Sequence, residues 1–327
     1  MTQPRLLIGD IGGTNARFAL ADPAGDRFGE VRSLACSNYD TAEDAVIDYL
    51  ESKNVAEPAV ICLAVAGPVI DQSVRFTNNH WRVDAAELAR RFSGVRVRLL
   101  NDFEAIAHSL PRLTKDDLVP IGLRDQSLKD KRDFTVGVLG PGTGLGVAGL
   151  VGRGDHRFAV VTEGGHVGFA PETQLQFEVL RHLRGRFDRV SEERLLCGPG
   201  LENIYWAIRK IHGASTVRAD AAEVFRRALE QSDVHATEAL NLFFEALGQS
   251  AGNAALSLGA YDGIYIGGGI IKRHPDLLKT SAFRSGFENK GRYRSLMERV
   301  PTMLITHPEP GLLGAADIAA GMYRDGT

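Results

Sequence analysis

Ile8-Gly9-Asp10-Ile11-Gly12-Gly13-Thr14-Asn15-Ala16-Arg17-Phe18-Ala19-Leu20 places a glycine pair between two strand-like segments. This composition predicts a tight β-hairpin, whose glycines can adopt positive φ and let a ligand approach the main chain. Successive exposed amides of such a turn bind anions such as phosphate. Asp10 ends the first strand and directs a carboxylate to the same place, which suits a metal ion or its waters. Alternatively, Asp10 and Asn15 only satisfy backbone groups of an ordinary hairpin.

The composition sets limits on the class of protein. At 327 residues the chain is long enough for two domains, and its 44% hydrophobic and 24% charged residues are typical of a globular protein. A net charge of -3 gives no electrostatic reason to expect nucleic acid or an anionic membrane as a partner. The sequence shows no signal peptide and no apolar run long enough to cross a bilayer, so we expect a cytoplasmic protein.

The three cysteines, Cys36, Cys62 and Cys197, are odd in number and lack the spacing of a metal site. This pattern indicates a reducing compartment, and no structural zinc is expected.

Apolar runs and helical spacing alternate through the first part of the chain. The run 58–66 is almost continuously apolar, which is typical of a buried parallel strand. Thr41 and Asp84 are expected to cap helices. After the hairpin we expect strands at 31–36, 58–66 and 95–100, and helices within 37–54, 84–92 and 103–110. The order is therefore three strands, helix, strand, helix, strand, helix.

The polar segment 114–133 is interpreted as the boundary between two domains. From Phe134 the scheme restarts, with a second glycine turn at Gly140-Pro141-Gly142-Thr143-Gly144 and a third at Gly267-Gly268-Gly269. We expect strands at 134–139, 145–151, 156–162, 263–266 and 302–306, and helices at 175–183, 200–211, 219–229, 237–258 and 311–323. The prediction is two copies of a β-β-β-α-β-α-β-α plan.

These features together resemble the superfamily of sugar kinases, chaperone ATPases and actin. More narrowly, the chain is similar to the bacterial glucokinase family in Leu100-Asn101-Asp102-Phe103, Glu163-Gly164-Gly165-His166-Val167-Gly168-Phe169, Ser191 to Leu201 and Gly311-Leu312-Leu313-Gly314-Ala315. The resemblance implies two actin-like (ribonuclease H-like) α/β domains with a nucleotide and sugar cleft between them. It implies a small domain of residues 1–112 and 307–327 and a large domain of residues 113–306.

The resemblance also implies ATP-dependent transfer of a phosphoryl group to the 6-hydroxyl of D-glucose, with a homodimer as the assembly. ATP would contact Gly9, Asp10, Ile11, Gly12, Gly13, Thr14, Gly142, Thr143, Gly144, Gly267, Gly268 and Gly269. The amides of both turns would hold the triphosphate, and Asp10 would reach Mg²⁺ through water. Two simpler interpretations stay open: a glycine-rich hairpin without ligand at 140–146, and a turn at 267–269 that only lets a helix pack closely.

The sugar would be held, by the same resemblance, by Asn101, Asp102, Glu163, His166 and Glu193. Asp102 would be the general base, and its place at the end of a strand suits a ligand site. An Asp before a helical pattern is equally an ordinary N-cap. His166 could be a satisfied loop histidine, and Glu193 an acidic residue in the first turn of a helix.

Other functions remain as alternatives. A kinase of the same fold could act on another hexose or an amino sugar, with the loop 77–81 and the residues near His166 deciding the choice. A non-catalytic sugar-responsive regulator would need a DNA-binding module, for which the residues before Asp10 leave no room. A filament or chaperone ATPase would leave the sugar-type residues without a purpose.

Overall fold

The structure is a computed structural model that describes residues 5–25, 27–76, 79–122, 128, 131–216, 218–269 and 271–326. The chain divides into two compact units. Unit 1 comprises Met1–Thr114, Leu128–Asp130 and His307–Thr327, and unit 2 comprises Lys115–Ser127 and Lys131–Thr306. Residues 77 and 78 of the loop considered for sugar choice, and residues 123–127, 129 and 130 of the polar boundary segment, lie outside the described residues.

Unit 1 is built on a mixed sheet with the strand order β3-β2-β1-β4-β7. Strand β1 pairs antiparallel with β2 and parallel with β4, which pairs parallel with β7. The predicted order of strands and helices is confirmed, with a small β5–β6 hairpin inserted before α2. The strands are β1 (Leu6–Ile11), β2 (Asn15–Ala21), β3 (Phe28–Ala35), β4 (Val60–Val65), β5 (Ser73–Arg75), β6 (Arg82–Asp84) and β7 (Arg96–Asn101), and the helices α1 (Ala42–Ser52), α2 (Ala85–Arg91), α3 (Asp102–Ser109) and α11 (Pro310–Arg324).

Local sequence explains these elements. Every residue of β4 is buried, because this apolar run lies between β1 and β7 with helices on its faces. Thr41 caps α1 in a reciprocal capping box with Asp44, and the Asp84 side chain accepts two amides at the start of α2. Both predicted caps are therefore confirmed.

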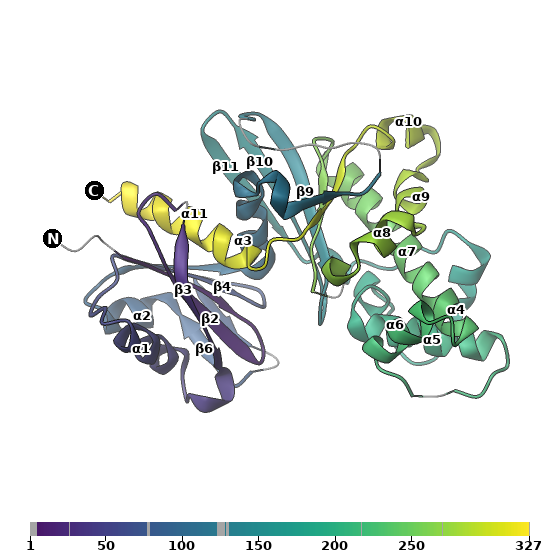
Figure 1. Cartoon of the computed structure of the whole chain (residues 1–327), viewed down its shortest axis with the longest axis horizontal. Coiled ribbons are helices and arrows are strands. Elements are labelled where there is room, and N and C mark those ends of the chain that lie inside the picture. The colour runs from purple at the N-terminus through teal and green to yellow at the C-terminus, as the bar shows by residue number, and fades with distance from the viewer. Residues whose placement is uncertain are drawn as a thin grey trace. The chain divides into compact units, whose positions relative to one another are not determined.

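The last helix of the chain, α11, packs on the sheet of unit 1 and along α3 (Figure 1). Its small residues Ala315, Ala316 and Ala319 are fully buried against β1 and β4. A Cβ atom at Gly314 would overlap the carbonyl of Ala105 in α3, so glycine allows the two backbones to approach closely. This contact supports α3, the helix that carries Asp102 at its start.

Unit 2 has the strand order β11-β10-β9-β12-β13-β8, so its first five strands repeat the sheet of unit 1. The predicted repetition is confirmed for the sheet, and the helices expected at 175–183, 200–211, 219–229, 237–258 and 311–323 are confirmed as well. The plan of one helix after each strand is wrong, because within the described residues four α-helices follow β11 where unit 1 has one, and the helix after β13 belongs to unit 1. The strands are β8 (Leu118–Pro120), β9 (Phe134–Pro141), β10 (Leu145–Arg153), β11 (His156–Thr162), β12 (Ile264–Ile266) and β13 (Thr302–Ile305), and the helices α4 (Gln174–Arg184), α5 (Gly198–Ile211), α6 (Ala221–Leu229), α7 (Val234–Leu258), α8 (Pro275–Thr280), α9 (Phe283–Glu288) and α10 (Arg294–Met297).

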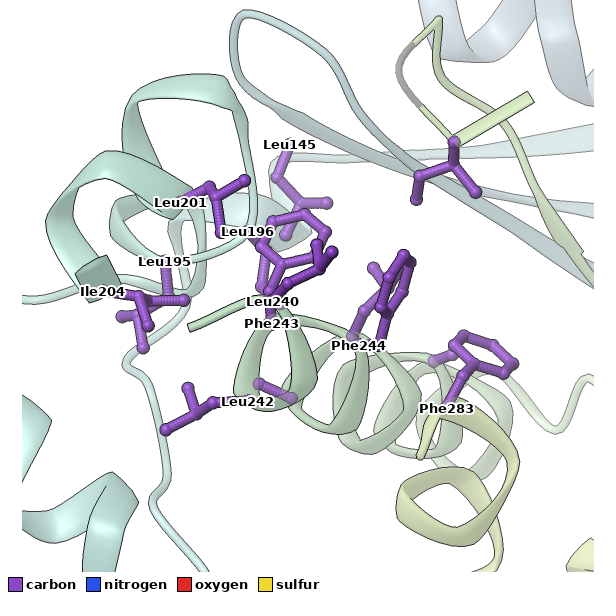
Figure 2. Close-up of a cluster of buried hydrophobic side chains, with 14 of the residues drawn as sticks. Leu145, Leu195, Leu196, Leu201, Ile204, Leu240, Leu242, Phe243, Phe244 and Phe283 are labelled. Carbon is purple, nitrogen blue, oxygen red and sulfur yellow. The ribbon is translucent and has the colours of Figure 1, made fainter. Parts of the chain in front are cut away.

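A large apolar core holds the helices of unit 2 against the start of β10 (Figure 2). Leu145 follows the second glycine turn directly, and Leu195 and Leu196 follow Glu193; all three are buried in this core with Phe243 and Phe244 of α7. Because interiors are close-packed, these side chains fix the backbone from which the candidate polar groups project.

Candidate active site

The first glycine turn joins β1 to β2 and has two free donors. The amide of Gly12 donates to the carbonyl of Asn15 at 2.9 Å and closes the hairpin. The amides of Gly13 and Thr14 donate to no group among the described residues. The Gly12 amide is thus engaged within the hairpin, and the φ of Gly12 is not positive. Two consecutive amides remain for an anion.

Asp10 lies beside this turn in a cluster of charged groups. Its Oδ2 is 3.8 Å from Nη1 of Arg17, and Nε of Arg17 is 3.7 Å from Oε1 of Glu309. A Cβ at Gly311 would come within 3.4 Å of the Asp10 carboxylate, so glycine leaves room around it. Burial raises the pKa of Asp10 to about 6, against the lowering effect of Arg17.

Two residues predicted to contact ATP lie inside the sheet instead. Gly9 is buried, and a Cβ there would lie 2.7 Å from Leu63 and 2.9 Å from Phe18. Ile11 is fully buried, and its carbonyl accepts the amide of Ala66 at 2.9 Å. Both residues therefore pack beneath the turn, and their predicted contact with ATP stays a prediction.

Asn101 and Asp102 stand at the same edge of the sheet as the first turn. Ile11, Val65 and Asn101 are aligned by register on the adjacent parallel strands β1, β4 and β7. Two strand spacings separate the outer pair, or roughly 10 Å. The shared edge is the carboxyl end of the parallel strands, where α/β sheets bind ligands.

The interpretation of Asp102 as an N-cap is wrong, because Asn101 has that role. The Asn101 Oδ1 atom accepts the amides of Phe103 and Glu104, and the Glu104 side chain accepts the Asn101 amide at 3.2 Å. The Nδ2 atom of Asn101 donates to the Gly67 carbonyl at 3.1 Å. Asp102 is the first residue of α3, half-buried, with Oδ1 accepting the amide of Phe103 at 2.9 Å.

The second glycine turn joins β9 to β10 and repeats the pattern of the first. The amide of Gly142 donates to the Gly144 carbonyl at 2.8 Å, and the Gly142 carbonyl accepts the amide of Gly198 at 3.0 Å. The amides of Thr143 and Gly144 find no acceptor within the described part of the chain. As in the first turn, one amide closes the turn, and the next two have no acceptor among the described residues.

Glu193 connects this turn to His166. Its Oε2 atom accepts the amide of Leu145 at 2.9 Å, and Oε1 lies 3.9 Å from Nδ1 of His166. A side chain at Gly144 would overlap the Glu193 carboxylate. The alternative interpretation placed Glu193 in the first turn of a helix, and Glu193 does lie in a short 3-10 helix, Glu192–Arg194. Its carboxylate, however, accepts a hydrogen bond next to the second glycine turn, from the amide of Leu145.

His166 and Glu163 bracket a 3-10 turn, Gly164–His166. The turn lies against β10, since a Cβ at Gly165 would overlap the Leu145 carbonyl and one at Gly164 would lie 2.9 Å from Val147. His166 is exposed, and its carbonyl accepts Nη1 of Arg189 at 2.7 Å. The exposed residue Glu163 accepts the His166 amide through its carbonyl at 3.0 Å.

The third glycine turn packs directly on the end of β9. A Cβ at Gly140 would lie 2.8 Å from the carbonyl carbon of Gly267, and one at Gly268 would overlap the Pro141 carbonyl. Gly268 also has a φ of 111°, which favours glycine. A Cβ at Gly269 would have no atom within 4 Å. Close packing thus explains Gly268, and it brings this turn beside the second one.

Residues 7–322, which include all of these turns and polar groups, match the family model described as glucokinase.

The chain belongs to the glucokinase family.

Relatives with this description align over nearly the whole chain. A glucokinase from Marinobacter nauticus is 43% identical over 312 residues, which cover 95% of this chain and 96% of that protein. A glucokinase from Caulobacter vibrioides is 43% identical over 316 residues, which cover 95% and 93%. The resemblance seen in the sequence is confirmed.

Solved structures agree on the glucokinase fold. A glucokinase from an Antarctic psychrotroph has a TM-score of 0.86 at 34% identity, covering 97% of this chain and 99% of that chain. A glucokinase from Balamuthia mandrillaris, solved in complex with glucose, has a TM-score of 0.76 at 22% identity, which shows a similar fold. Across the described residues, no helix of this glucokinase-family chain is long and apolar enough to span a membrane.

Sequence reasoning missed three residues around the proposed reaction groups: Arg17, Glu309 and Gly311. The signal for Gly311 was present in the Gly-Leu-Leu-Gly motif, whose first glycine faces Asp10 and whose second faces α3. Glu309 precedes Pro310 at the start of α11. Its approach to Arg17 depends on the packing of α11 against β1, which this part of the sequence does not reveal.

Proposed function

We propose that this glucokinase-family chain transfers the γ-phosphoryl group of ATP to the 6-hydroxyl of D-glucose, with Asp102 as general base. The observation that carries the proposal is the repeated turn: Gly12–Thr14 and Gly142–Gly144 each present two consecutive amides without an acceptor among the described residues. Each turn also has a carboxylate beside it, Asp10 in unit 1 and Glu193 in unit 2.

The four free amides are suited to phosphate oxygens. Gly13 and Thr14 would bind one part of the triphosphate, and Thr143 and Gly144 another. Fixed backbone donors stabilise charge that develops during phosphoryl transfer without having to reorganise. The glycine turn at 267–269 adjoins the second turn and supports a role in holding the adenosine.

Mg²⁺ is compatible with the groups around Asp10. It prefers oxygen ligands and keeps several waters, so one carboxylate with space around it is sufficient. Gly311 provides that space, and because burial raises the pKa of Asp10, a cation bound beside its carboxylate would stabilise the charged form. When bound, Mg²⁺ would neutralise charge on the phosphates. We propose that Asp10 holds it through water.

Asp102 would take the proton of the 6-hydroxyl as its oxygen bonds to the γ-phosphorus. The bond from that phosphorus to the bridging oxygen of ADP breaks in the same step, so ADP leaves with the electron pair. Asn101 positions this base, because its capping bonds set the first turn of α3. One hydrogen of its Nδ2 atom is committed to Gly67, which leaves one for a sugar hydroxyl.

Glu193, His166 and Glu163 would bind further hydroxyls of the sugar. Glu193 and His166 lie together, and both can exchange hydrogen bonds with hydroxyl groups. Burying a hydroxyl without a partner costs about 1–3 kcal/mol, so such a set selects for a sugar that pairs with every member.

The test compares Asp102→Asn with the wild type and with Asp155→Asn, a change of an exposed aspartate in unit 2. With ATP and Mg²⁺, a coupled assay across several hexoses should show glucose as the best substrate. Asp102→Asn should lose about 10²–10⁴-fold in kcat and keep glucose affinity in calorimetry, and Asp155→Asn should match the wild type. Near-normal turnover in Asp102→Asn would remove it from the base role, and a better hexose or amino sugar would change the substrate.

We further propose a homodimer working in the cytoplasm. The exposed Phe158 and Val161 lie on β11, at the end of the strand order of unit 2, and an apolar edge of this kind suits association. The three cysteines are free and buried, as suits a reducing compartment. Sedimentation should give a dimer that Phe158→Ser weakens; a monomeric wild type would contradict it.

A further inference from the structure

Two histidines and a glutamate meet at one end of the helices of unit 2, apart from the groups proposed for phosphoryl transfer. His212 is the C-cap of α5, and His235 and Glu238 lie near the start of α7. Each offers one ligand atom, and the three atoms lie within 4.8 Å of one another. Imidazole nitrogens and carboxylate oxygens are ligands of Zn²⁺ and its first-row neighbours.

The contacts within this cluster suit a shared ligand. Nε2 of His212 lies 2.8 Å from Oε2 of Glu238, and the rings of His212 and His235 stack with centroids 5.1 Å apart. His235 and Glu238 are three residues apart on one helix, so they project from the same side. The two elements that carry the cluster also pack on each other, as Leu201 and Ile204 of α5 share a core with Leu240 of α7.

The three ligand atoms would have to move only a short distance to reach the geometry of a metal site. In a tetrahedral site with ligands near 2.1 Å, ligand atoms lie about 3.4 Å apart. The most separated pair, within 4.8 Å now, would have to close by at most about 1.4 Å. The side chains of His212 and Glu238 are 45% and 32% exposed, so both can move by that amount without displacing the core.

His235 supplies the second, independent observation. Its Nδ1 atom is buried and has no hydrogen-bond partner in the described part of the chain. A buried polar atom without a partner destabilises the fold, and such atoms in native structures call for an explanation. A cation bound through this nitrogen would supply the partner that the described neighbouring groups do not.

We propose that His212, His235 and Glu238 bind a divalent first-row transition metal, Zn²⁺ foremost, which ties the end of α5 to the start of α7. Water completes the coordination, because the cluster has three protein ligands. Mg²⁺ prefers an all-oxygen site, so the cation of the phosphoryl transfer does not compete here. The expectation of no structural zinc rested on cysteine spacing, which does not detect a site assembled from two helices.

The experiment uses the full chain without a histidine tag, freed of metals by chelation and then titrated with ZnCl₂ or CoCl₂. We expect one equivalent of Zn²⁺ in calorimetry, visible absorption typical of Co²⁺ with nitrogen and oxygen ligands, and a thermal unfolding midpoint several degrees higher with saturating Zn²⁺. Excess Mg²⁺ should leave all three unchanged.

His235→Ala and Glu238→Gln should abolish the stoichiometric binding and the Co²⁺ spectrum. His156→Ala, which removes an exposed histidine of β11, is the matched control and should bind like the wild type. If circular dichroism shows that His235→Ala does not fold, His212→Ala takes its place in the test, because the side chain of His212 is about half exposed and its loss leaves the core intact. Absence of stoichiometric binding in the wild type, or binding unchanged in these variants, would overturn the site.

Discussion

Gly144 leaves free the space that the carboxylate of Glu193 occupies when it accepts the amide of Leu145. The second glycine turn and a proposed sugar ligand are therefore one structural unit, although 48 residues separate Leu145 from Glu193.

Gly144→Ala should displace the Glu193 carboxylate from Leu145. Loss of a hydrogen bond to a charged group costs about 1.5–3 kcal/mol, so kcat/KM for glucose should fall roughly 10–100-fold. Gly29→Ala is the control and should keep its activity, because a Cβ at this glycine of β3 would have no atom within 4 Å. Steady-state kinetics measures both, and an unaffected Gly144→Ala would contradict the coupling.

Asn101→Ala should lower both stability and turnover. It removes the cap of α3, worth about 1 kcal/mol, and the bond to the Gly67 carbonyl. Because Asp102 begins the same helix, kcat should fall more than the KM for glucose rises. Asn101→Asp retains an oxygen for capping and should recover most of the thermal stability. Wild-type kcat in Asn101→Ala would show that the base does not depend on this cap.

Asp10 should make stability depend on pH in the nucleotide-free protein. Its pKa is about 6 when folded, against an ordinary 3.8, so the folded state holds a proton that the unfolded chain has released between these values. As pH rises from 4 to 6 this contribution falls, by at most about 3 kcal/mol, and above pH 6 it stays lost.

Asp10→Asn removes this dependence. Its stability relative to the wild type should increase between pH 5 and pH 7 in urea unfolding, and Asp155→Asn should show no such trend. A relative stability that stays flat over this range would mean that the Asp10 carboxylate is not strained by burial. The same variant should bind Mg²⁺-ATP more weakly than the wild type.

Gly314→Ala should destabilise unit 1. The added methyl group would overlap the carbonyl of Ala105, and overpacking of this kind costs about 1–3 kcal/mol. Gly321→Ala lies on the same helix, with only the flexible end of Arg324 as near as 4.0 Å, and should be neutral or stabilising. Thermal unfolding of the two variants gives the comparison; equal midpoints would contradict the close packing of α11 and α3.

The sequence was sufficient to predict most strands of the two sheets, because continuous apolar runs such as 60–65 and alternating runs such as 16–20 have a direct physical meaning. It was not sufficient for β8 or for α8 to α10, which are too short to show a period. Motifs in the sequence identified the polar residues of the candidate site, but they did not reveal which hydrogen bonds those residues make. Whether Gly12 or Gly13 keeps a free amide depends on how each hairpin closes, and whether Asn101 or Asp102 caps α3 depends on one residue of helix register.

The contact between the end of β9 and the turn at 267–269 has a consequence for engineering donor selectivity. Main chain lies on main chain at Gly140 and Gly268, so neither position can be enlarged to read a different nucleobase. A Cβ at Gly269 would meet no atom within 4 Å, so, on the proposed placement of adenosine at this turn, we expect Gly269 to be the position where a new side chain can alter nucleotide selectivity.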